Sequence, residues 1–140
     1  MPPDPLPEFL ADIAASPVVN ELISRLTGPL RHAPATGQWG SCALALAAIV
    51  QHKLRRPMLV LTAHLDDADD ALSQLQFFRQ GCEAALFPAY EVLPGESNVS
   101  QELVCDRLEL LNRLAAENNA GQPSFIVARL GLPAFSHMAA

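Results

Sequence analysis

Cysteine and basic residues are both scarce in the 140-residue sequence, and each scarcity excludes a class of protein. The three cysteines, Cys42, Cys82 and Cys105, are odd in number, far apart and without a C-x-x-C pair. This pattern argues against a disulfide framework or a zinc site and is typical of a reducing compartment. Nine Lys and Arg oppose fifteen Asp and Glu, so the net charge is −6. A general nucleic-acid-binding surface would be basic, and we do not expect one.

The sequence also lacks long hydrophobic runs. The longest apolar stretch, residues 42–50, is far too short to span a bilayer, and no basic region followed by an apolar core marks a signal peptide. We therefore expect a soluble, cytoplasmic protein with no membrane partner. Half of the residues are hydrophobic although only 6% are aromatic. This composition suffices for one packed α/β domain, or for one domain with a fragment of a neighbour.

The stretch TGQWGSC at 36–42 stands where a phosphate-binding loop would stand, between a predicted extended segment and a predicted helix. In a working P-loop, G-x-x-x-x-G-K-[ST], backbone N–H groups surround the phosphates, a lysine contacts them and a hydroxyl holds Mg²⁺. With Gly40 as the second glycine, Ala35 takes the first glycine position, Ser41 the lysine position and Cys42 the hydroxyl position. The cation is missing, and a thiol replaces the oxygen that magnesium prefers. We interpret the loop as a vestigial P-loop with no cofactor, comprising Gly37, Gly40, Ser41 and Cys42.

Hydrophobic periodicity and turn residues divide the chain into alternating helices and strands. Ser16 and Pro17 mark a helix start, as N-cap and first helical residue, and Gly28 marks the end of that helix. Such alternation predicts a three-layer α/β fold with a parallel sheet and right-handed crossovers. The predicted helices are 5–15, 17–26, 41–55, 66–80 and 100–117. The predicted strands are 58–62, 84–87 and 124–128. We expect a short extended segment at 30–35, and a short helix or a disordered tail at 131–140.

Three expectations about burial follow from the same patterns. The continuous apolar run at 58–62 is typical of a parallel strand that is covered on both faces. We expect Cys42 to be a small buried residue and not a reactive thiol, since reactive thiols are exposed. The buried stripe predicted for the helix at 100–117 consists of Leu103, Val104, Leu108, Leu111 and Leu114.

His64 and the carboxylates that follow it are a candidate metal site. They come directly after the predicted strand at 58–62, and open α/β sheets place their ligands at the carboxyl ends of strands. The alternative is that Asp66 caps a helix and that Asp67, Asp69 and Asp70 stabilise its first turn through the helix dipole. We favour this second interpretation and expect no metal, because the sequence shows no second cluster of ligands.

Candidate catalytic residues do not combine into a known arrangement. Ser41 lacks the G-x-S-x-G pattern of a nucleophile elbow, so we interpret it as a helix cap. Glu91 could act as a catalytic carboxylate, but no second acid is placed to share acid–base work. No apolar run ends in Asp-Glu, so no Walker B carboxylate is visible. We therefore expect no catalytic residues in this chain.

Several motifs, taken in order, resemble the N-terminal region of the bacterial transcription-repair coupling factors (the Mfd family), which is similar to the first domain of the excinuclease protein UvrB. The resemblance covers roughly residues 17–135, and its most specific part is FPAYEVLP at 87–94, which matches the F-P-x-W-E-x-L-P pattern of the family with Tyr90 in place of Trp. The stretches that carry it are GQWGSCA at 37–43, PMLVLT at 57–62, FPAYEVLP at 87–94, DRL at 106–108 with Leu111 and Leu114, and FIVA at 125–128.

The resemblance implies a UvrB-like or RecA-like helicase-type domain whose ATP site has decayed. Residues 1–16 would be an N-terminal helical extension, and residues 17–140 would be UvrB-like domain 1a, a fragment of a larger protein with an incomplete sheet. In this family the ATP-driven motor and the contacts with RNA polymerase and DNA lie elsewhere in the parent protein, and UvrA is recruited mainly by a neighbouring domain. UvrB itself clamps DNA with a tyrosine-rich hairpin, whereas the corresponding loop here is short and holds only Tyr90.

The leading hypothesis is therefore a non-catalytic scaffold or recruitment module of transcription-coupled nucleotide excision repair. An incomplete sheet would also leave apolar surface exposed and favour self-association. One alternative is an active nucleotide-binding domain that uses a variant loop from Gly37 to Ser41. Another is a stand-alone adaptor with no link to nucleotides.

Overall fold

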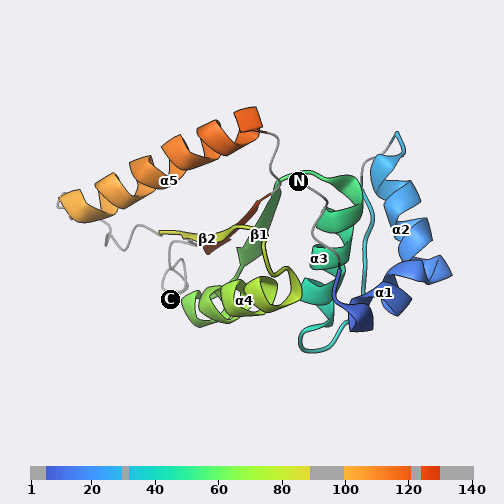
Figure 1. Ribbon diagram of the computed structural model, residues 1–140. Helices are drawn as coiled ribbons and strands as arrows, with labels where there is room; N and C mark the ends of the chain where they lie inside the picture. The colour runs from blue at the N-terminus through green and yellow to red at the C-terminus, as the bar shows by residue number, and fades with distance from the viewer. Residues whose placement is uncertain (1–5, 30–31, 89–99, 121–123, 130–140) are drawn as a thin grey trace.

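The protein folds as alternating helices and strands around one small parallel sheet (Figure 1). The computed structural model describes residues 6–29, 32–88, 100–120 and 124–129. The order of elements agrees with the sequence prediction over these residues. The elements are α1 (Glu8–Ala15), α2 (Pro17–Thr27), α3 (Cys42–Leu54), β1 (Met58–Thr62), α4 (Leu65–Phe78), β2 (Ala84–Phe87), α5 (Gln101–Ala120) and β3 (Phe125–Arg129).

The three strands are parallel and lie in the order β1-β3-β2. Phe125 of β3 is in register with Met58 of β1 and with Ala84 of β2, so β3 is the central strand. The chain crosses outward from β1 to β2 through α4 and returns to β3 through α5. Right-handed crossovers in opposite directions place their helices on opposite faces, and Figure 1 shows α4 and α5 on opposite sides of the sheet. The predicted α/β class with a parallel sheet is confirmed.

Local sequence signals set the start and end of α2 as predicted. Ser16 is the N-cap, and its hydroxyl oxygen accepts a hydrogen bond of 3.4 Å from the N–H of Val19. Pro17 is the first helical residue, where its missing N–H costs nothing. Gly28 ends the helix, and its N–H donates to the carbonyl of Arg25.

The buried side chains form two clusters that meet at α3. The first joins α1, α2 and α3 to the end of α4 through Leu10, Val19, Ile49 and Phe78. The second lies between α4 and the sheet and is centred on Leu75, Phe125 and Val127. Leu44 packs against both clusters. Helix α1 therefore shares a core with the residues that follow it.

The predicted coverage of β1 on both faces is wrong. Met58 and Val60 pack toward α4, but Leu59 is 59% exposed and Leu61 is 52% exposed on the opposite face. The reason is that α5, the helix on that face, contacts β2 and leaves β1 without a helix among the described residues. An apolar run shows that both faces can be buried, and does not show that both are.

The buried stripe predicted for α5 is also partly wrong. Leu110 is the buried leucine of this helix, whereas Leu108 and Leu111 are 55% and 49% exposed. Leu103, Val104 and Leu114 are half-buried. The helix has more apolar surface than β2 can cover, and the side that contacts the sheet is the side of Leu110.

A polar network is buried where α3 and α4 end. Gln51 is fully buried and Arg79 is 3% exposed. The Nε–H of Arg79 donates to Oε1 of Gln51 over 3.2 Å, and Nε2 of Gln51 donates to the sulfur of Cys82 over 3.3 Å. Because buried polar groups are costly without partners, this network fixes the relative position of the two helix ends.

Replacing Gln51 with leucine should destabilise the fold by about 2 kcal/mol, because it removes the acceptor of a buried guanidinium hydrogen bond. Chemical denaturation monitored by circular dichroism measures the change. Gln76→Leu, at an exposed position of α4, is the matched control and should change stability little. Equal effects of the two substitutions would contradict the structural role of the network.

Candidate functional site

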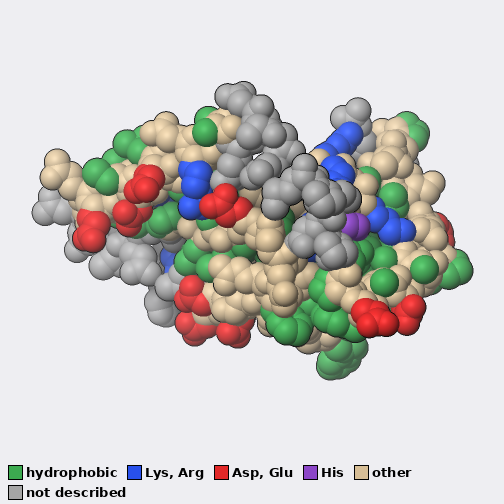
Figure 2. Space-filling view, viewed as in Figure 1, with side chains coloured by type: hydrophobic (Ala, Val, Ile, Leu, Met, Phe, Trp, Pro, Cys, Tyr) green, Lys and Arg blue, Asp and Glu red, His purple; other side chains and the backbone are tan. Residues whose placement is uncertain are grey.

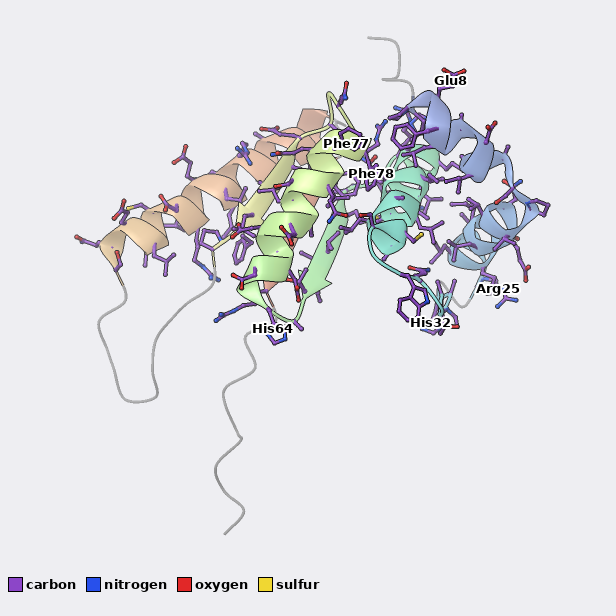
Figure 3. The ribbon with its side chains drawn as sticks, turned by 90° about the horizontal axis from the view of Figure 1, so that it is seen from below. Glu8, Arg25, His32, His64, Phe77 and Phe78 are labelled. Carbon is purple, nitrogen blue, oxygen red and sulfur yellow. The ribbon has the colours of Figure 1, made fainter. Side chains whose placement is uncertain are left out.

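The glycine loop lies at the edge of the sheet where the parallel strands end. Helix α3 spans about 20 Å and β1 about 16 Å, and the short connection at 55–57 turns one back beside the other. The start of α3 is therefore at the carboxyl end of β1, as is the start of α4. Figure 3 shows His64 and His32, which precede these two helices, at one end of the molecule, with Phe77 and Phe78 at the other. Open α/β sheets bind ligands at this edge.

The segment before the loop does not belong to the sheet. Residues 32–39 form neither helix nor strand, so the predicted extended segment at 30–35 is not a strand over its described part, 32–35. A proline cannot donate to a strand ladder, and Pro34 lies in this segment. Over residues 32–39, the loop is thus not preceded by a strand of the kind that holds a P-loop against its sheet.

The two glycines keep a turn that other residues adopt with strain. Gly37 and Gly40 have φ angles of 75° and 55°, in the left-handed region. The N–H of Cys42 donates to the carbonyl of Trp39 over 3.2 Å, and the carbonyl of Ser41 accepts from the N–H of Ala45 over 2.9 Å. These bonds close the turn onto the first residues of α3.

The structure corrects two expectations at the start of α3. Ser41 occupies the predicted N-cap position, but its side chain makes no capping hydrogen bond. Cys42 is exposed and not buried as expected. The reason is that the first turn of α3 extends past the packed helices, whereas Ala48, Ile49 and Val50 in its second half are buried.

No lysine can serve this loop. The only lysine of the sequence, Lys53, lies near the other end of α3, about 17 Å along the helix from Cys42. Its ammonium group donates to Oδ1 of Asn20 on α2 over 2.8 Å. In a working P-loop, a lysine would occupy the position that Ser41 has in this sequence.

The edge of the sheet at the carboxyl ends of the strands carries acidic side chains in place of a lysine. Four exposed aspartates lie in the first half of α4, and they repel an anion from this edge of the sheet. Figure 2 shows acidic side chains gathered at this end of α4. The four residues are Asp66, Asp67, Asp69 and Asp70.

His64, and not Asp66, is the N-cap residue of α4. Its backbone is extended, its side chain makes no capping bond, and the hydroxyl of Thr62 donates to its carbonyl over 3.1 Å. Asp66 and Asp67 are already in the first turn, where the helix dipole stabilises them. Within the ranges that the structure describes, no three His, Cys, Asp or Glu side chains stand close enough to hold a metal ion.

A cavity of about 390 Å³ lies between α2 and the loop before α3, and no pattern in the sequence predicted it. Gln38 from the glycine loop and Arg25 from α2 reach it, but Arg25 is already paired with Glu21. This pairing leaves no excess positive charge for a phosphate among the described lining residues. The cavity is lined by Val18, Val19, Glu21, Leu22, Arg25, Pro34, Ala35, Thr36, Gln38 and Leu46.

Arg107 of α5 contacts the end of β2. Its guanidinium lies 4.2 Å from the centre of the Phe87 ring, and Nη1 donates to the carbonyl of Pro88 over 2.6 Å. Arg107 thus joins α5 to the last residue of β2 and to the residue after it. Tyr90 and Glu91, and the predicted tail from 131, lie outside the described residues.

Comparisons of the chain with protein-family models, with curated proteins and with solved structures each find no match. None of the helices in the described ranges has the length and apolar character needed to cross a bilayer.

Gly40→Ala should destabilise the protein by about 1 kcal/mol, because alanine resists the left-handed conformation although no atom obstructs its methyl group. Gly40→Asn should lose less, because asparagine tolerates this conformation. Thermal denaturation of both variants measures the difference. Equal losses, or a larger loss for asparagine, would contradict the role assigned to the backbone angle.

Proposed function

We propose that the chain is a non-catalytic scaffold module of a transcription-coupled nucleotide excision repair factor. In this proposal it has a UvrB-like fold and supports the recruitment of UvrA, which is bound mainly by a neighbouring domain of the parent protein. The module itself binds no nucleotide and performs no reaction. ATP and magnesium serve a motor elsewhere in the parent, and RNA polymerase and DNA are also bound elsewhere in it.

One observation carries the non-catalytic part of this proposal. The glycine loop is at the edge where a nucleotide would bind, yet Ser41 stands at the lysine position and Lys53 is held at the far end of α3. The aspartates of α4 add negative charge to the same edge. A triphosphate there would have backbone N–H groups but no cation, and phosphate binding by such loops depends on both.

The link to repair rests on the resemblance of the motifs, and the contacts of Arg107 support it. They bring Phe87 and Pro88, the first residues of the most specific motif, into contact with Arg107 of the DRL stretch. The apolar surface left on β1 and α5 fits a module that works inside a larger protein.

Titration of the purified chain with Mg-ATP and Mg-ADP by calorimetry should give no binding heat at high micromolar nucleotide. The physical reason is the missing cation beside the glycine loop. Saturable binding that is lost in Gly40→Asp would contradict the scaffold role, because it would show that Ser41 and backbone N–H groups hold phosphate without a lysine.

A nucleotide-binding domain with a variant loop is the second candidate, because Gly37 and Gly40 keep their positive φ angles and the helix start has no side-chain cap. Ser41→Lys tests whether only the cation is missing. Tight Mg-ATP binding by this variant, with none by the natural sequence, would support a decayed site. Binding by neither would indicate that the segment at 32–39, which forms no strand, also matters.

Interaction with UvrA separates the scaffold from a stand-alone adaptor. In surface-binding measurements with purified UvrA, the chain alone should bind weakly or not at all, and a protein that joins it to the neighbouring domain of a transcription-repair coupling factor should bind. Tight binding by the chain alone would favour the adaptor and contradict the supporting role proposed here.

A further inference from the structure

Two phenylalanines stack on each other at the surface where α1 meets the end of α4. The ring centres of Phe9 on α1 and Phe77 on α4 are 5.9 Å apart, and Phe78 contacts both rings, at 6.2 Å and 5.6 Å. Phe78 is 8% exposed and belongs to the core, whereas Phe9 is 51% exposed and Phe77 is 59% exposed. The stacked rings join α1 to α4, yet about half of each outer ring remains open to solvent.

Ile13 extends this apolar surface along α1. It lies one helical turn after Phe9, on the same side of the helix, and is 45% exposed. We call Phe9, Ile13 and Phe77 the aromatic patch. Figure 3 shows Phe77 and Phe78 at the end of α4 that faces the start of α1, where Glu8 lies. Single exposed apolar side chains are ordinary, but a group of adjacent ones is typical of a binding surface.

The charges that α1 adds beside the patch are negative. Its charged residues are Glu8 and Asp12, both exposed, and it has no Lys or Arg. At about 100° per residue, Asp12 lies about 60° around the helix from Phe9, on the side away from the buried Leu10. The outer border of the patch on α1 is therefore acidic.

Helix α4 continues this acidic border. Its charged residues are the four exposed aspartates at 66, 67, 69 and 70, again without Lys or Arg. Asp70 lies on the same side of α4 as Phe77, two turns before it and about 10 Å away along the axis. Arg79, the residue after α4, is 3% exposed and donates to Gln51, so it belongs to the core.

An aromatic surface beside carboxylates fits arginine better than any other side chain. The planar guanidinium stacks on aromatic faces and also donates paired hydrogen bonds to carboxylates. The chain itself contains such a stack, since the guanidinium of Arg107 lies 4.2 Å from the centre of the Phe87 ring. It also contains such a pair, between Arg25 and Glu21 on the surface of α2.

We propose that the aromatic patch binds a basic amphipathic segment of a partner protein. An arginine of the segment stacks on Phe9 or Phe77 and pairs with Glu8 or Asp12, and an apolar side chain of the segment contacts Ile13. The acidic border disfavours a second copy of this chain, which would bring like charges together, and it disfavours an anionic membrane surface for the same reason. This partner site is separate from the glycine loop and goes beyond the proposed scaffold role.

The size of the patch indicates weak binding. Three half-exposed side chains offer on the order of 300 Å², whereas each partner of a standard interface contributes about 800 Å². The dissociation constant should therefore be about 100 μM, and high salt should raise it because exposed charge pairs are screened.

Fluorescence anisotropy with the full chain tests the proposal. The probe is a labelled synthetic helix that has leucine along one side and arginine on both flanks. The natural chain should bind it saturably, and Phe77→Ser should raise the dissociation constant about fivefold or more. Val18→Ser, at an apolar residue of α2 that is 77% exposed, is the matched control and should change nothing. No binding by the natural chain, or equal effects of the two substitutions, would overturn the proposal.

A second pair of variants separates the patch from general attraction, because the net charge of −6 could draw a basic peptide to any acidic surface. Glu8→Gln combined with Asp12→Asn should weaken binding about threefold or more. Glu102→Gln combined with Glu109→Gln removes the same charge from exposed positions of α5 and should have little effect. Equal weakening by the two pairs would show that binding is not specific to the patch and would overturn the proposal.

Two further measurements address folding and the other possible occupants. Circular dichroism should be the same for all variants, and the charge variants test the site without touching its rings. In sedimentation equilibrium, a dimer that Phe77→Ser disrupts would make a second copy the occupant. Much tighter peptide binding after residues 1–5 are replaced by Gly and Ser in the full chain would make that segment the occupant. Either result would overturn the proposal.

Discussion

A parallel sheet needs apolar cover on both faces, and the described residues provide it fully on only one of them. Helix α4 covers the first face, where Leu75, Phe125 and Val127 are almost fully buried. On the second face α5 reaches β2 and stops there. The exposed leucines of β1 and the unused leucines of α5 are two consequences of this one difference. They leave apolar surface exposed on the α5 side of the sheet.

A second constraint, which is electrostatic, acts at the glycine loop. The backbone at Gly37 and Gly40 still turns through the left-handed region, so geometry alone does not exclude an anion. Charge decides the question, because the first turn of α3 offers partial positive charge only, and the aspartates at the start of α4 oppose it. A helix terminus contributes about half an elementary charge, which is small beside four full negative charges at the same edge. The proposed loss of nucleotide binding therefore depends on side chains and not on the shape of the loop.

The elements could be predicted from the sequence because their signals are local. Ser16, Pro17 and Gly28 bound α2 where they were expected, and the predicted strands at 58–62 and 84–87 match β1 and β2. Exposure could not be predicted in this way, because it depends on which element lies opposite. The run at 58–62 is apolar on both faces, yet Leu59 and Leu61 are exposed because α5, among the described residues, contacts β2 and not β1.

The same distinction explains the errors at the candidate site. The position of Cys42 at a helix start was predictable, whereas its exposure depends on how far α3 extends past its neighbours. His64 and Asp66 are both acceptable near a helix start, and the place where β1 ends decided which became the cap. The cavity beside α2 has no local signature, because its walls come from residues up to 28 positions apart in the chain, from Val18 to Leu46.

The glycine loop and the exposed leucines lie on separate surfaces of the molecule. The glycine loop lies at the start of α3, whereas Leu59 and Leu61 lie on the α5 side of the sheet. Nucleotide binding at the loop therefore says nothing about what covers these leucines. In the proposed scaffold module, a neighbouring segment of the larger protein would cover β1 and bury them. Because such a segment is tethered, its effective concentration at this surface would be high.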